Sequence, residues 1–287
     1  MEIIELSELK KIKLYCQLIR YHNLLIGAAA VLVMAQLLQY SNHSMIFLCA
    51  LVVMAIMALG NIDNDIVDKN IDKINHPDRV IVSKSLSLRE IKIFKKILIA
   101  LVFILTLQFN YWCAVLIFGV IIPLLFLYNY YLKNYFLIGN IVVAFLLGFV
   151  FVFSELALTE RLHFSFIPFM LAFNLSLIRE IIKDMQDYIG DLKHNVKTAP
   201  VILGINKTSY CLSAYIIVCI VLFILPYLYG FYGKLYLISL IFCIEIPLIY
   251  SVFLLLKVQK KSSFKRLSFL HKNLSVLGLI VILLSKG

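Results

Sequence analysis

Two short stretches of the sequence each place three aspartates at the same spacing, D-x2-D-x3-D. We call them the first and the second acidic triad: Asp65, Asp68 and Asp72, and Asp184, Asp187 and Asp191. At about 100° per residue, these positions fall within about 60° of arc on an α-helix, so each triad is expected to present its carboxylates on one helical face. Gathered carboxylates need a counter-charge, and hard divalent cations with oxygen ligands are the usual one. The spacing therefore predicts a metal site between the two triads.

Further polar residues extend both triads. Asn64 lies four residues before Asp68, so that an amide carbonyl stacks with the carboxylates along one stripe of the helix. Such a row can hold one or two Mg2+ ions and still leave positions free for substrate oxygens. Glu180 precedes Asp184 by four residues and faces the same way. We therefore predict Mg2+ as the cofactor and the following metal ligands: Asn64, Asp68, Asp72, Asp184, Asp187 and Asp191.

Basic residues accompany the second triad. Arg179 and Lys183 lie on the flank of the same expected helix, where they can reach a phosphate directly. Acidic rows with basic flanks beside apolar segments suit a diphosphate attached to a hydrocarbon chain. Metal ions make the diphosphate a better leaving group, and the cations stabilise its departing charge. The apolar interior of the protein then accepts the hydrocarbon.

The composition is that of an integral membrane protein. Of the 287 residues, 62% are hydrophobic, and the mean hydropathy is +0.96. The apolar runs are near the roughly 20 residues that cross a bilayer, and helices satisfy their own backbone hydrogen bonds in lipid. We expect an all-α polytopic bundle that forms a single domain over residues 1–287. Its nine predicted transmembrane helices cover residues 18–38, 44–62, 91–108, 112–130, 136–156, 164–183, 207–228, 234–256 and 268–285.

The distribution of lysine and arginine predicts the orientation. Basic residues gather before the first span and in the stretches 69–96, 179–207 and 257–266, whereas the connections 39–43 and 109–111 contain none. The positive-inside rule then places the N-terminus and both acidic triads on the cytoplasmic side, in helical loops after spans two and six. The net charge of +11 is mainly a topology signal, and no basic soluble domain exists that would bind nucleic acid.

Polar residues outside the triads carry further, weaker signals. Arg20 and Asn23 form a polar pair within the first span, and such pairs are functional by default, so both are predicted to bind substrate. His76 and His194 follow the two triads and are expected to be solvated loop residues. The six cysteines are scattered through apolar segments and predict neither a disulfide framework nor a zinc site.

Both acidic segments resemble the signatures of the UbiA superfamily of intramembrane prenyltransferases. The resemblance extends over most of the chain, and within the superfamily it is greatest to the branch that contains digeranylgeranylglyceryl phosphate synthases. The stretches that carry it are NDIVDKNID (64–72), KINHPDRVIVSKSLS (73–87), LYNYYLKNYFLIGNIVVAFLLG (127–148), REIIKDMQDYIGD (179–191) and VKTAPVILG (196–204).

The resemblance implies a reaction and roles for particular residues. A polyprenyl group, geranylgeranyl by this resemblance, would move from its diphosphate to a lipophilic acceptor such as geranylgeranylglyceryl phosphate, which yields an ether lipid. Arg79 and Lys133 would contact phosphate oxygens, and Asp65 or Asp68 would take the acceptor's proton. Tyr128 would steady the allylic cation. The protein would lie in the inner or plasma membrane of a prokaryotic cell, with its active site facing the cytoplasm.

Two alternatives stay open at this point. The first is a prenyltransferase of the same fold with an aromatic acceptor, as in quinone synthesis. The second belongs to a different class, a cation transporter, which would use carboxylates near the bilayer centre on broken helices. The triads lie instead at the predicted cytoplasmic ends of spans, so the sequence favours the transferase.

Overall fold

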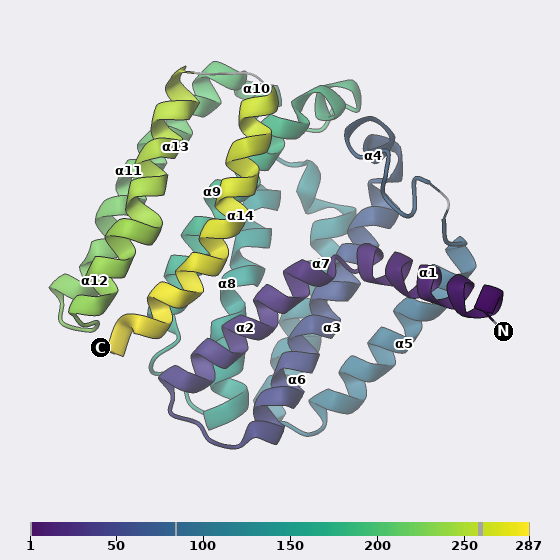
Figure 1. Cartoon of the computed structure of the whole chain (residues 1–287), viewed down its shortest axis with the longest axis horizontal. Helices are drawn as coiled ribbons and strands as arrows, with labels where there is room; N and C mark the ends of the chain where they lie inside the picture. The colour runs from purple at the N-terminus through teal and green to yellow at the C-terminus, as the bar shows by residue number, and fades with distance from the viewer. Residues whose placement is uncertain (1, 84, 258–260, 287) are drawn as a thin grey trace.

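The computed structural model describes residues 2–83, 85–257 and 261–286, and these residues form a bundle of helices without strands. Figure 1 shows the long helices running side by side, with the short helices α4 and α10 at one end of the bundle. The elements are α1 Glu2–Leu18, α2 Tyr21–Leu37, α3 His43–Val67, α4 Lys69–Asn75, α5 Leu88–Thr106, α6 Tyr111–Leu116, η1 Ile117–Ile121, α7 Ile122–Tyr130, η2 Leu132–Asn134, α8 Ile138–Thr159, α9 Phe166–Lys193, α10 Ala199–Leu203, α11 Ile205–Leu228, α12 Lys234–Leu240, η3 Ile241–Glu245, α13 Ile246–Lys257, α14 Lys261–Leu283 and η4 Leu284–Lys286.

The middle of the bundle is formed by α9, which packs against α8 on one side and α14 on another. Gly148 makes the first of these contacts possible, because a Cβ atom at this position would lie 2.9 Å from the carbonyl oxygen of Phe169 on α9. A small residue at a helix crossing lets two backbones approach closely, as is common between transmembrane helices. The close α8–α9 contact holds the second acidic triad against the N-terminal end of α8.

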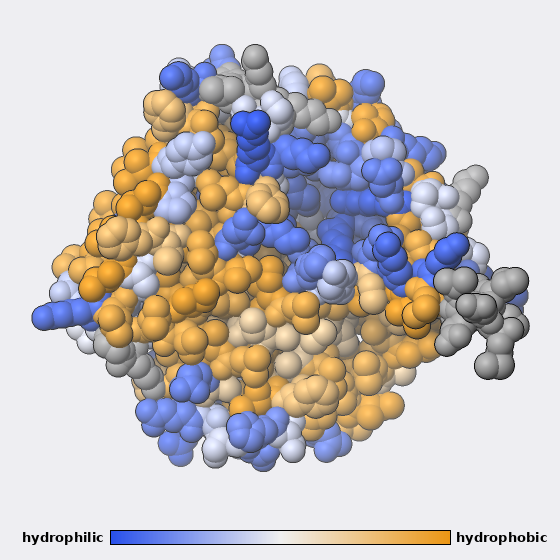
Figure 2. Space-filling view, in the orientation of Figure 1, coloured by the Kyte–Doolittle hydropathy of each residue, from blue (hydrophilic) through white to orange (hydrophobic). Residues whose placement is uncertain are grey.

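The surface agrees with a membrane environment. In Figure 2 hydrophobic residues form a broad band across the molecule, and polar residues gather along its lower edge and around a hollow in its upper right part. Leu32, Val221 and Phe253 are each more than half exposed along the long helices. Large apolar side chains exposed in such number would be unfavourable in water and are expected where helices face lipid.

Each of the nine predicted spans coincides with helical structure. Within the described part of the chain, six helices are long and apolar enough to cross a membrane, and a seventh if the bent pair Leu9–Leu18 and Tyr21–Leu37 counts as one span. The helices α5 and α9 carry several charged residues, which keeps them out of that set. An integral membrane protein is thus supported, whereas nine spans and a single domain over residues 1–287 stay predictions.

Two long helices contain a π-helical turn just before a proline. The turn η1 precedes Pro123, and η3 precedes Pro247. Proline lacks the backbone N–H and clashes with the preceding turn, and a wider turn accommodates it without ending the helix. The predicted spans 112–130 and 234–256 are therefore continuous but locally distorted.

Two interruptions of the helices lie beside the acidic triads. The axis bends by 63° between Leu9–Leu18 and Tyr21–Leu37, and Arg20 at this bend has a left-handed backbone with φ 54°. The second interruption corrects a prediction, because α3 ends at Val67 and Asp68 lies between α3 and α4. The first triad is therefore distributed over two helices and their junction, whereas the second lies on the single helix α9 as predicted.

At the opposite end of α8, Glu155 organises the connection to α9. Its carboxylate accepts hydrogen bonds from the backbone N–H groups of His163, Phe164 and Ser165 at 3.0, 2.9 and 2.9 Å. Hydrogen bonds to an ionised acceptor are about twice as strong as neutral ones. This buried carboxylate thus anchors the loop that leads into α9, far along α8 from the triads.

Candidate active site

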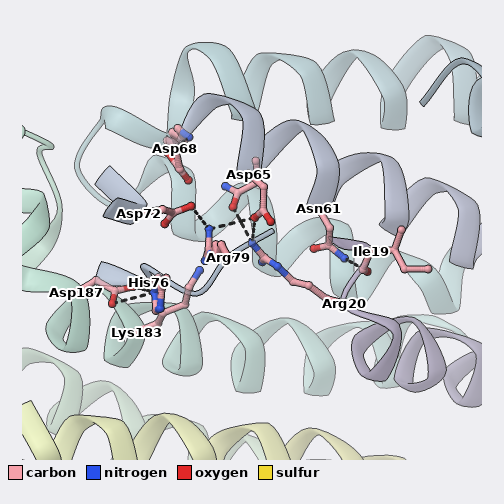
Figure 3. A network of polar contacts seen from close by, with 12 residues as sticks. Ile19, Arg20, Asn61, Asp65, Asp68, Asp72, His76, Arg79, Lys183 and Asp187 are labelled. Carbon is pink, nitrogen blue, oxygen red and sulfur yellow. Dashed lines mark hydrogen bonds and ion pairs between the residues drawn. The ribbon is translucent and has the colours of Figure 1, made fainter. Parts of the chain in front are cut away.

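The first triad is held by arginines from two other segments (Figure 3). Arg79 lies between two carboxylates, with Nη1 3.1 Å from Oδ1 of Asp65 and in a short contact with Asp72. Arg20 donates to Oδ1 of Asn64 at 3.2 Å and forms a short ion pair with Asp65. Asp65 and Asp72 are nearly inaccessible to solvent, so the paired cations balance charges that burial would otherwise disfavour.

The third carboxylate of this triad meets a lysine from a turn between helices. Asp68 forms a short ion pair with Lys133, which belongs to the 3-10 turn η2. The turn packs tightly against the start of α8, because a Cβ atom at Gly139 would lie 2.8 Å from the Cα atom of Lys133. Lys133 is 65 residues from Asp68 in the sequence, and the packing of η2 against α8 brings its side chain to the triad.

Each carboxylate of the second triad has a polar neighbour. Asn140 of α8 donates from Nδ2 to Asp184 at 2.8 Å, and the hydroxyl of Thr198 donates to Asp191 at 3.4 Å. Nε2 of His76 lies 3.3 Å from Oδ1 of Asp187, as Figure 3 shows. His76 follows α4 as the predicted loop residue but is only partly exposed because it faces Asp187, whereas His194 is exposed as predicted.

The two triads are adjacent because α4 packs on α9. Asn75 at the end of α4 donates from Nδ2 to the carbonyl oxygen of Asp187 at 3.3 Å. Gly190 permits this approach, since a Cβ atom there would lie 2.3 Å from the Asn75 amide. The segment after the first triad thus rests directly on the helix that carries the second.

Crowding of the carboxylates affects their protonation. Burial raises the pKa of Asp191 to about 7, with a further contribution from the neighbouring charge of Asp187 and a smaller one from Asp68. Burial also raises the pKa of Asp72, against the opposing effect of Arg79, and the charges of Asp68 and Asp65 add to the increase. The influence of Asp68 on Asp191 means that the triads share one electrostatic environment.

The donor atoms suit a hard divalent cation. Carboxylate and amide oxygens are the ligands that Mg2+ prefers, and Oδ1 of Asn75, beside Asp187, is buried without a hydrogen-bond partner. Throughout the described residues, however, no three His, Cys, Asp or Glu side chains are grouped so that they could hold a metal ion. Arg20, Arg79 and Lys133 instead pair with the first triad. The residue types fit the predicted ion, and protein cations compete for the same oxygens.

A cavity of about 280 Å3 opens beside the first triad and runs into the apolar bundle. Its lining is mainly aliphatic and aromatic, with a polar end formed by six predicted site residues: Arg20, Asn23, Asn64, Tyr128, Arg179 and Lys183. This combination of a charged end and a long apolar wall is that of a site for an amphipathic ligand with an anionic head. The hollow in Figure 2 is bordered by polar side chains in the same way.

The structure brings the predicted residues into two neighbouring sets. Six line the cavity, and the others form the network of triads and cations, namely Asp65, Asp68, Asp72, Arg79, Lys133, Asp184, Asp187 and Asp191. Sequence analysis missed His76, Asn140 and Thr198. The spacing of four residues from Asp72 to His76 was a usable signal, since residues at i and i+4 share a helical face. Asn140 lies in an apolar span and gave no local signal.

Comparisons with known proteins agree with this arrangement. The model of the UbiA prenyltransferase family matches residues 24–274. A digeranylgeranylglyceryl phosphate synthase of Methanococcus maripaludis (strain C6) is 36% identical over 260 residues, covering 88% of this chain and 91% of the relative. A solved structure from work on digeranylgeranylglyceryl phosphate synthase in membranes has a TM-score of 0.72 at 32% identity, covering 96% of this chain and 98% of the other.

A more distant structure shares the fold. A UbiA homologue from Archaeoglobus fulgidus, solved bound to DMAPP and Mg2+, has a TM-score of 0.68 at 18% identity and covers 93% of this chain and 98% of its own. The resemblance predicted from the two acidic motifs is confirmed by the family match and by the relatives that cover nearly the whole chain. The chain therefore belongs to the UbiA prenyltransferase family.

Proposed function

We propose that this protein is an intramembrane prenyltransferase that moves a geranylgeranyl group from its diphosphate to geranylgeranylglyceryl phosphate, in the synthesis of an ether lipid. The observation that carries the proposal is the apolar cavity whose polar end adjoins two acidic triads. The relatives named digeranylgeranylglyceryl phosphate synthase support the acceptor. A site of this form accommodates both a hydrocarbon chain and an anionic head.

We propose Mg2+ as the cofactor, and the Mg2+ bound with DMAPP in the Archaeoglobus fulgidus homologue supports this choice. When bound, the ion would neutralise the diphosphate and so improve it as a leaving group. The residues that would hold it are Asn64, Asp68, Asp72, Asp184, Asp187 and Asp191. Binding requires that the protein cations now paired with the first triad give up some of their contacts.

The protein's own residues would then act on the two substrates. Arg79, Lys133 and Lys183 would turn from carboxylates toward the phosphate oxygens as the C1–O bond of the donor breaks and diphosphate departs. The acceptor's hydroxyl oxygen attacks C1, and Asp65 or Asp68 takes the released proton. Tyr128 lines the cavity near its polar end, where its ring would stabilise the allylic cation.

The rest of the cavity has a different task. Its apolar wall would hold the prenyl chains and exclude water, which would otherwise capture the allylic cation. Arg20, just before α2, and Asn23, in its first turn, line the cavity and would contact substrate. The membrane would be the inner or plasma membrane of a prokaryotic cell, and the distribution of basic residues supports an orientation with this polar end facing the cytoplasm.

The acceptor can be tested directly. Purified protein is incubated with labelled geranylgeranyl diphosphate and, in parallel, geranylgeranylglyceryl phosphate, a hydroxybenzoate or a naphthoate. We expect a labelled ether lipid in the first reaction. Product only with an aromatic acceptor would refute the ether-lipid assignment, and ion flux in liposomes without any transfer would support a transporter instead.

A further inference from the structure

One wall of the cavity carries more positive charge than its neighbours balance. Arg179, Lys183 and Lys272 line it together with a single carboxylate, Glu180. The first two belong to α9, and Lys272 comes from α14, which packs on α9. Three cations against one anion leave unbalanced positive charge at this part of the cavity lining.

Glu180 is already occupied by two of these cations. Its Oε1 accepts from Nη1 of Arg179 at 3.1 Å, and its Oε2 lies 3.4 Å from Nζ of Lys183. The Nε atom of Arg179 is buried and has no hydrogen-bond partner. A buried donor of a charged group that lacks a partner is energetically costly. The Nε–H group of Arg179 therefore indicates that a bound anion accepts this hydrogen bond.

Lys272 has no such carboxylate. Among the residues that the structure describes, no hydrogen bond or ion pair is found for its ammonium group, although the side chain is half-buried. The nearby guanidinium of Arg179 repels it. Two like charges held together beside a cavity are stabilised when an anion binds between them.

We propose that Lys272 and Arg179 bind the phosphate of the acceptor lipid, at a position separate from the diphosphate of the donor. This inference rests on the proposed function. A phosphate monoester carries about −1.5 to −2 charges at neutral pH, and the two cations Lys272 and Arg179 would face it. Lys272 and Arg179 would thus select an acceptor that carries a phosphate over a neutral one.

The position is consistent with two separate phosphate sites. Arg179 precedes Asp187 by eight residues on the continuous helix α9, which corresponds to about 12 Å along its axis. In glyceryl phosphate the hydroxyl and the phosphate are only a few bonds apart. A phosphate held at Arg179 and Lys272 would therefore leave the hydroxyl between this wall and the triads, where the donor's C1 atom would lie.

The test compares acceptors with and without phosphate. Lys272→Gln removes the charge and keeps most of the side-chain length. We expect its KM for geranylgeranylglyceryl phosphate to rise at least tenfold, with an unchanged KM for geranylgeranyl diphosphate. With geranylgeranylglycerol, which lacks the phosphate, the variant and the wild-type protein should react at equal rates, and Lys272→Arg should restore the low KM.

Lys265→Gln is the matched control, because Lys265 is exposed on the same helix and does not line the cavity. It should leave every KM unchanged, and thermal unfolding in detergent reports whether each variant is folded. An unchanged acceptor KM in Lys272→Gln, an equal loss with both acceptors, or a raised donor KM would overturn the assignment. Failure of the wild-type protein to prenylate any glyceryl acceptor would instead overturn the proposed function.

Discussion

Arg79 pairs with Asp72, one of the proposed metal ligands, and with its neighbour Asp65, so the removal of Arg79 should favour metal binding. Arg79 bridges Asp65 and Asp72, with 3.1 Å between Nη1 and Oδ1 of Asp65. At an effective dielectric constant of about 20, two unit charges at this distance attract by about 5 kcal/mol before desolvation is counted. Desolvation of the buried carboxylates and the partial exposure of Arg79 reduce the net value to roughly 1–3 kcal/mol.

Arg79→Gln removes the competing charge but keeps a polar side chain of similar shape. Because Arg20 stays paired with Asp65, we take the lower part of this range, about 1.4 kcal/mol, which corresponds to a tenfold change in an equilibrium constant. We expect Mn2+, used as a paramagnetic substitute for Mg2+, to bind about tenfold more tightly to the donor-free variant. Electron paramagnetic resonance of the free ion in detergent measures this binding without any turnover.

The same substitution should have the opposite effect on the donor. Since Arg79 is proposed to contact the diphosphate, KM for geranylgeranyl diphosphate should rise while the metal dissociation constant falls. Lys95→Gln is the control, because Lys95 pairs with Asp63 on the same helix α3 but outside the triad. Weaker or unchanged Mn2+ binding by Arg79→Gln would refute the view that Arg79 and the metal compete for one set of oxygens.

Three further predictions concern the metal, the contact between the triads and the distant end of the bundle. Removal of divalent ions with EDTA should abolish transfer and added Mg2+ should restore it; full activity after chelation would contradict the metal-dependent mechanism. Gly190→Ala should lower kcat/KM at least tenfold with little change in the unfolding temperature. The new Cβ atom would lie 2.3 Å from the Asn75 amide and would displace it, which separates α4 from α9. A fully active variant would show that this contact is dispensable. Glu155→Ala should lower the free energy of unfolding by about 2–4 kcal/mol, since three backbone N–H groups lose their charged acceptor, while transfer by the folded protein at low temperature stays near the wild-type rate.

The second triad was more predictable from the sequence than the first, for a local reason. From Phe166 to Lys193 the chain is one regular helix, so helical spacing alone places Asp184, Asp187 and Asp191 correctly relative to one another. The same spacing misplaced Asp68, because α3 ends there and Lys133, 65 residues further along the chain, pairs with it. Periodicity contains no information on a partner that distant.

The cavity lining was predictable only in part. Arg20 and Asn23 were identified because polar residues are costly within an apolar span. Lys272 lies in a more polar helix and was not singled out, although it lines the same cavity. An apolar face of a membrane helix can meet either lipid or a neighbouring helix. The amphipathic pattern of α14 alone therefore does not reveal which of its faces packs on α9.

The interruptions of the helices explain why the charges converge where they do. Arg20 lies at the bend before α2, Asp68 between α3 and α4, and Lys133 in the turn after α7. Backbone groups released by such breaks are tolerated at membrane depth only inside protein or beside a polar cavity. Each break also points a charged side chain across the bundle, which a continuous helix facing lipid could not do. The left-handed backbone of Arg20, which costs about 1–2 kcal/mol for a residue with a side chain, is offset by its contacts with Asn64 and Asp65. The bend at Arg20 and the ion pair between Arg20 and Asp65 therefore act together to hold the polar end of the cavity against the first triad.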